Sequence, residues 1–190
     1  MHETNAVSLT NNIVARKSTI VQATWILTFA VLTALGAQIE IPHQPIPYTL
    51  QTLFVLLSGA LLGTRNGGLS QILYVAAGAI GLPVFSGLGF GFARILGPTG
   101  GYLLSFPVAA LAVGYLVNGQ TSLLRIVSAM VVGLFIIFSL GTVQLYVVYY
   151  RDWSAAFVNG FLIFSIWDIV KLATAAAVYH QYARWKYTSK

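Results

Sequence analysis

The sequence contains no cysteine, which excludes disulfide bonds, thiolate metal sites and cysteine nucleophiles together. Histidine is almost as scarce. His2 lies in a polar N-terminal tail, His43 in an expected loop and His180 near the C-terminus, so the three are not expected to converge on a metal ion or to pair with a serine. The sequence therefore predicts no metal site, no cofactor and no enzyme activity.

Charged residues are also scarce. Only 7% of the 190 residues are charged and 57% are hydrophobic, whereas an ordinary globular domain has about 25% charged residues. Runs such as LFVLLSGALL lack the alternation that a transmembrane β-strand requires. The ten basic residues form no cluster with interleaved aromatics, which argues against a nucleic-acid partner. The composition predicts an all-α polytopic membrane protein whose partner is the lipid bilayer.

Apolar segments recur between Thr19 and Tyr182, and about 20 apolar residues are enough to cross a bilayer. We expect a single six-helix transmembrane domain at 19–182, between a polar tail at 1–18 and a basic tail at 183–190. A cleavable secretory signal is less favoured for the first segment because its apolar run is long. The expected spans are 19–38, 49–62 with a start near Ile46, 69–80, 102–117, 123–150 and 155–182.

Two connections are unusual for solvated loops. Residues 39–48 carry prolines at 42, 45 and 47, which cannot continue a helix and bias each preceding residue towards extended geometry. Residues 85–101 are rich in glycine and aromatics, and irregular backbone of this kind is tolerated at membrane depth where it lines a cavity. Residues 63–68 are expected to form a tight turn. The first two segments are predicted to cover a cavity.

The distribution of lysine and arginine sets the expected orientation. Six spans place both termini on one side, and that side holds seven of the basic residues, whereas the other side holds only Arg94 and Arg151. The positive-inside rule then places both termini in the cytoplasm and both irregular loops outside. We expect a multi-pass protein of the plasma (inner) membrane.

Asp168 and Lys171 stand out within the last apolar segment. Three residues apart on a helix, they share a face with Phe164, and a charge at bilayer depth costs roughly 2.5–3.5 kcal/mol unless it faces protein or a polar cavity. This face is the first candidate for a binding site. The alternative is that the two charges neutralise each other and only orient the helix.

Arg94 is one of two outward cations and has no acidic neighbour in its loop. An unpaired arginine beside an apolar cavity suits a carboxylate ligand, which it can bind with two parallel hydrogen bonds. Contact with a lipid headgroup phosphate is the open alternative.

Two stretches carry a family resemblance. Pro45–Gly63 reads PIPYTLQTLFVLLSGALLG, and Gly78–Phe106 reads GAIGLPVFSGLGFGFARILGPTGGYLLSF. Both resemble the BioY family, the biotin-binding membrane subunits (S components) of energy-coupling-factor (ECF) vitamin transporters, and the similarity extends from Val21 to Tyr182. The resemblance implies a six-helix bundle that captures biotin from outside and mediates its uptake.

The resemblance also implies that the D-x-x-K arrangement of Asp168 and Lys171 binds the vitamin. A carboxylate can accept hydrogen bonds from the ureido N–H groups of biotin, and an ammonium can donate to the ureido carbonyl. Arg94 is our own inference for the biotin carboxylate, and a lid contact is expected from the segment 48–51, including Gln51. Aromatic residues expected to bury the ring system are Trp167, Phe164, Phe85, Phe90 and Phe92.

Partners are implied in the same way. S components of this kind dock on a membrane coupling subunit that is driven by two ATPase subunits, and this chain has no nucleotide-binding motif of its own. Ala30 and Ala34 match an A-x-x-x-A docking surface on the first helix by type and spacing, although packing within the chain explains them equally well. The alternatives for function are an S component for another small vitamin and, less favoured, an intramembrane enzyme.

Overall fold

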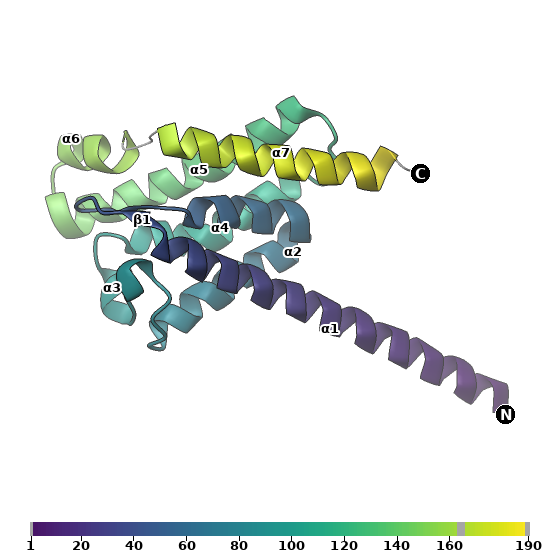
Figure 1. The fold of residues 1–190 in the computed structure, drawn as a ribbon. Helices are drawn as coiled ribbons and strands as arrows, with labels where there is room; N and C mark the ends of the chain where they lie inside the picture. Colours follow the sequence, from purple (N-terminus) through teal and green to yellow (C-terminus); the bar gives the residue numbers. More distant parts are fainter. Residues whose placement is uncertain (1, 163–165, 189–190) are drawn as a thin grey trace.

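The computed structural model describes residues 2–162 and 166–188, and the side chains from Ser18 to Tyr187 within them. The fold is almost entirely helical (Figure 1). Its long helices are α1 (His2–Gln38), α2 (Gln51–Ala79), α4 (Gly100–Leu116), α5 (Leu123–Leu145) and α7 (Ile166–Thr188). The N-terminal end of α1 extends away from the other helices, and it continues without a break into the first apolar segment. The expected tail at 1–18 is therefore helical from His2 onwards.

Short elements connect the long helices. The two-residue strands β1 (Glu40–Ile41) and β2 (Tyr48–Thr49) pair antiparallel and close the proline loop. The glycine-rich segment contains a 3₁₀ turn, η1 (Ser86–Leu88), and the helix α3 (Phe92–Leu96). Both irregular loops were predicted correctly. Near the other end of the chain, the π-helical turns η2 (Tyr146–Tyr150) and η3 (Phe157–Phe161) flank α6 (Trp153–Ala156).

Helix α2 is a hairpin of two arms, because Gly63 has φ 78° and ψ 176° and breaks the helix. A left-handed φ of this kind favours glycine. The arms then pack closely, so that a Cβ on Gly67 would lie 2.7 Å from the Cα of Gly59. The sequence predicted this reversal as a turn over 63–68, whereas a single residue makes it. The predicted start near Ile46 is also wrong, because β2 occupies 48–49 and α2 begins at Gln51.

Fewer than six of the described helices are long and apolar enough to span a membrane. By length and composition, the described helices at 18–38 and 123–150 can each cross a bilayer, and a third span is formed if the pieces 153–161 and 166–187 count as one. Those two pieces are inclined by 48°, so the predicted last span at 155–182 is bent if they form one span. The all-helical class is confirmed, and the count of six spans stays a prediction.

Helix α4 lies at the centre of the bundle, where it packs against α2 and α5 (Figure 1). Small residues allow this close approach, as in membrane proteins generally. Gly59 of α2 leaves no space for a side chain against the backbone of Ala110, and Ala109 beside it is fully buried. Helix α1 covers α2, while α7 packs against both α2 and α5. This arrangement brings the N-terminal ends of α2 and α7 together.

Candidate functional site

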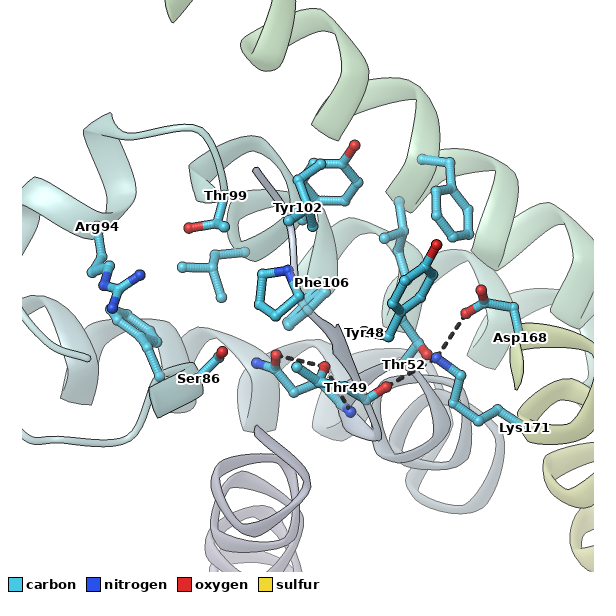
Figure 2. Close-up of a pocket in the computed structure, with 17 residues that line it drawn as sticks. Tyr48, Thr49, Thr52, Ser86, Arg94, Thr99, Tyr102, Phe106, Asp168 and Lys171 are labelled. Atoms are coloured by element: carbon cyan, nitrogen blue, oxygen red, sulfur yellow. Dashed lines mark hydrogen bonds and ion pairs between the residues drawn. The ribbon is translucent and has the colours of Figure 1, made fainter. Parts of the chain in front are cut away.

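A cavity lies where β2, the start of α2, the glycine-rich segment, α4, α5 and α7 meet (Figure 2). Its volume is about 80 Å³, measured as the space open to the centre of a water-sized sphere. A single water needs roughly 10–15 Å³ on this measure, so the cavity has room for a small molecule. Its polar lining residues are Tyr48, Thr49, Gln51, Thr52, Ser86, Arg94, Thr99, Tyr102, Asp168 and Lys171.

The charged end of the cavity is the ion pair between Asp168 and Lys171. The Lys171 Nζ atom lies 2.7 Å from Asp168 Oδ1, and the two side chains are only 5% and 4% exposed. Lys171 Nζ also donates a hydrogen bond to the Thr49 carbonyl oxygen at 2.9 Å, which ties α7 to β2. An ammonium has three donors, so one remains for another acceptor. The structure confirms that both charges face a cavity, as the sequence predicted.

A hydrogen-bond relay fixes Gln51 in the cavity wall. The Thr49 hydroxyl donates to Gln51 Oε1 at 2.8 Å, and Gln51 Nε2 donates to the Tyr74 hydroxyl at 2.6 Å. Tyr74 in turn donates to the Val84 carbonyl oxygen at 3.2 Å. The relay links β2, both arms of α2 and the start of the glycine-rich segment, so it holds the polar wall in one arrangement.

Phe85 supplies an apolar wall from the glycine-rich segment. Its ring lies over Gly78, where there is no space for a Cβ atom, and meets Tyr74 edge-on with 5.6 Å between ring centroids. The end of α1 fixes this segment: Gln38 Nε2 donates to the Phe85 carbonyl oxygen at 3.0 Å, and the Leu88 N–H donates to Gln38 Oε1 at 3.0 Å. Phe85 is therefore a buried, anchored member of the site, as predicted.

Arg94 on α3 lines the opposite end of the cavity from Asp168 and Lys171 (Figure 2). Across residues 2–162 and 166–188, its guanidinium has no ion pair or hydrogen bond. A guanidinium has five N–H donors and no acceptor, so this end of the cavity can bind an anion. The cavity thus has an ion pair at one end, a free cation at the other, and apolar walls between them.

Three predicted aromatic residues lie elsewhere. Trp167, Phe90 and Phe92 are exposed and do not line the cavity. Trp167 precedes Asp168 on α7, and neighbouring helical residues point about 100° apart, so the two cannot share the inward face. Phe164 lies outside the described residues. Tyr48, in the segment 48–51 expected to contact the ligand, lines the cavity, and the aromatic lining that the sequence analysis missed is formed by Tyr102, Phe106 and Phe138.

A signal for part of this lining was present in the sequence. Tyr102 and Phe106 are four residues apart on α4, which places them on one helical face. Both are buried, and the Tyr102 hydroxyl donates to the Gly160 carbonyl oxygen at 2.9 Å. Thr52, Ser86 and Thr99 were also missed, because single hydroxyl residues are common in helices and loops alike.

The alanine pair on α1 faces the interior. Ala30 is 6% exposed and belongs to the core, and Ala34 is partly buried against that core. Close packing of α1 on its own bundle, the alternative interpretation, accounts for both residues, and the docking role of the pair stays a prediction.

Comparison with known proteins identifies relatives over most of the chain. The model of the BioY family matches residues 8–188. A probable biotin transporter BioY from Pyrococcus horikoshii is 41% identical over 150 residues, which cover 79% of this chain and 88% of the relative. The biotin transporter BioY from Thermotoga maritima matches with the same identity and the same coverage.

A solved structure has the same fold. It is a crystal structure of the S-component for biotin from an ECF-type ABC transporter, and it matches with a TM-score of 0.81. The match covers 88% of this chain and 93% of the other at 20% sequence identity. At this identity the likeness shows that the two chains share a fold.

Proposed function

Because the chain belongs to the BioY family, we propose that it is a membrane protein that binds biotin and mediates its uptake. Its relatives from Pyrococcus horikoshii and Thermotoga maritima are named as biotin transporters, and the segment matched by the family model, 8–188, contains the residues that line the cavity. Membership of a transporter family makes the chain a carrier of its substrate and not an enzyme.

The observation that carries this proposal is the separation of the two charged ends of the cavity. Biotin has a ureido group at one end, with two N–H donors and one carbonyl acceptor, and a carboxylate at the other. Asp168 can accept from a ureido N–H, and the remaining Lys171 donor can reach the carbonyl. Arg94 can bind the carboxylate, with Phe85 and Phe106 against the apolar ring system between them.

The proposal includes an orientation. The excess of lysine and arginine on the side of the termini favours a plasma-membrane protein with both termini in the cytoplasm. The cavity, which lies beside the proline loop and the glycine-rich segment, then faces the outside. In this arrangement the vitamin reaches its site without crossing the bilayer first.

The proposal also includes an energy source. The solved structure with this fold is the biotin S-component of an ECF-type ABC transporter, which supports coupling to a membrane subunit and two ATPase subunits. Because Ala30 itself is buried, we propose that exposed residues of α1 form part of the surface for that coupling subunit. The outward face of α1, with exposed Trp25, Val31 and Leu35, is available on the same helix.

The proposal is tested by titrating biotin into the purified chain by calorimetry, beside the Asp168→Asn and Lys171→Ala variants. Truncating one member of a buried charge pair typically costs 2–5 kcal/mol of binding, which is roughly a 30-fold to 4,000-fold loss of affinity. Lys186→Ala serves as the matched control, because Lys186 is an exposed cation at the far end of α7. A size-exclusion profile like that of the wild type shows that each variant is folded.

The titration also separates the substrate alternatives. Saturable heat with biotin that is lost in both site variants and kept in Lys186→Ala supports the assignment. If the wild type gives no heat with biotin but binds thiamin or riboflavin, the transporter class stands and the substrate assignment is wrong.

A further inference from the structure

The hydroxyl of Thr52 is a buried polar atom with no hydrogen-bond partner among the residues that the structure describes. Thr52 lies in the first turn of α2 and lines the cavity, and its Oγ1 atom is shielded from solvent. Buried hydroxyl groups are almost always paired, because an unpaired one has lost its water and gained nothing in return. An orphaned hydroxyl in the wall of a cavity indicates that a ligand supplies the missing partner.

The position of Thr52 in the fold explains why the protein does not satisfy this hydroxyl itself. A threonine within a helix commonly donates to the carbonyl four residues earlier. Thr33 donates to the Phe29 carbonyl oxygen at 2.8 Å, and Thr174 donates to that of Val170 at 2.8 Å. Four residues before Thr52 is Tyr48, which lies in β2, before the helix begins. The hydroxyl is therefore left for another acceptor.

The surroundings of Thr52 indicate which part of a ligand it meets. Thr52 is one turn after Thr49, whose carbonyl oxygen accepts the hydrogen bond from Lys171. Figure 2 draws Thr52 on the side of Asp168 and Lys171, with Arg94 across the cavity. The hydroxyl thus belongs to the end of the cavity that holds the ion pair.

We propose that the Thr52 hydroxyl is a hydrogen-bond contact to the ureido end of the ligand and helps to set specificity there. This inference rests on the proposed function, since it takes biotin as the ligand. A hydroxyl donates one hydrogen bond and accepts others, and the ureido group offers both an acceptor and donors. A ligand with an apolar group at that position would leave Thr52 unpaired, so the site discriminates against it.

The test replaces Thr52 with valine, which has the same shape without the hydroxyl. Calorimetry on the full chain compares the wild type, Thr52→Val, Thr52→Ser and a control, Thr174→Val. Thr174 lies on α7, donates its hydroxyl to the Val170 carbonyl oxygen and does not line the cavity. Two probes are used: biotin, and biotin methyl ester in competition with biotin, because the ester lacks the charged carboxylate.

Loss of one hydrogen bond predicts about tenfold weaker binding by Thr52→Val for both probes. Thr52→Ser should bind nearly as the wild type does, because it keeps the hydroxyl, and Thr174→Val should bind biotin with the wild-type affinity. Without ligand, Thr52→Val should melt at the temperature of the wild type or above it, because an unpaired buried hydroxyl has been removed. Thr52→Ala provides a second hydroxyl-free variant if the valine variant does not fold.

Each other result overturns the assignment in a distinguishable way. Equal biotin affinity of Thr52→Val and the wild type would show that the Thr52 hydroxyl does not contact the ligand, and the proposed function would still stand. Equal losses in Thr52→Ser and Thr52→Val show a packing role. If Thr52→Val weakens the binding of biotin but not that of its methyl ester, Thr52 contacts the carboxylate end of the ligand. If the wild type binds no biotin, the proposed function fails and this inference fails with it.

Discussion

Replacing Lys171 with methionine removes the cation that faces the buried Asp168 carboxylate, and we expect this variant to be strongly destabilised even without ligand. Methionine keeps most of the volume of the lysine stem and removes only the charge and its donors. The lost interactions are the 2.7 Å contact with Asp168 and the 2.9 Å hydrogen bond to the Thr49 carbonyl oxygen, both in a wall that is almost closed to solvent.

The magnitude follows from the burial of both partners. Breaking a buried ion pair by removing one member costs about 3–5 kcal/mol, because the other charge stays buried without compensation. Replacing both members by neutral groups of similar size is often close to neutral. The double variant Asp168→Asn/Lys171→Met still loses the hydrogen bond to Thr49, which is worth about 1 kcal/mol. It should therefore recover about 2–4 kcal/mol relative to Lys171→Met.

The assay is the free energy of unfolding in detergent micelles, measured by denaturant titration without biotin. The two single variants and the double variant form a cycle whose coupling energy isolates the pair. Lys186→Met, at an exposed cation of α7, should stay within about 0.5 kcal/mol of the wild type. Equal free energies of unfolding for Lys171→Met and the double variant would refute this reasoning, because they would show that the Asp168 charge does not destabilise the protein when the lysine is absent. The double variant should regain stability but not biotin binding.

Further outcomes are expected for the rest of the site and for the orientation. Arg94→Gln should weaken biotin binding by about 10-fold to 100-fold in the same calorimeter, because the contact with the carboxylate is lost. The binding of biotin methyl ester should be unchanged. An equal loss of affinity for both probes would show that Arg94 does not bind the carboxylate. Phe85→Ala should weaken binding by about tenfold or more, because a packed wall of the cavity is removed, whereas exposed Phe90→Ala should bind as the wild type does. The chain has no cysteine, so single cysteines at exposed Arg65 and Arg151 test the topology: a membrane-impermeant maleimide should label intact cells at 151 and should need permeabilisation to reach 65. The reverse pattern would invert the proposed orientation.

The polar parts of the site could be predicted from the sequence because charge is costly inside a membrane. Asp168 and Lys171 had to face protein or a cavity, and the structure places both in the same cavity wall. The proline loop could be predicted for an equally direct reason, since proline removes the backbone donors that a helix needs. In these two cases a single constraint, the cost of charge in lipid or the missing donor of proline, is enough to predict the structure.

The aromatic walls could not be predicted in the same way. In a soluble protein a large apolar side chain belongs inside, but lipid is as apolar as a protein core, so the hydrophobic effect no longer separates the two. Phe85 is buried at the cavity, whereas Phe92 in the same segment is exposed. Composition and spacing do not distinguish them. The difference comes from contacts distant in sequence, such as the hydrogen bond of Gln38 to the backbone of Phe85.

Polar residues at the ends of helices can indicate a binding site that the pattern of apolar residues does not reveal. A threonine inside a membrane helix satisfies its hydroxyl on the preceding turn, so its presence there says little about a site. A threonine in the first turn has no helical carbonyl to use. Thr52 could therefore have been singled out if the start of α2 had been placed at Gln51 and not near Ile46. If the helix began near Ile46, the Thr52 hydroxyl could donate to the backbone carbonyl of Tyr48 within the helix. Because the helix begins five residues later, this hydroxyl is free to bind a ligand, so the position of the helix boundary decides whether Thr52 belongs to the site.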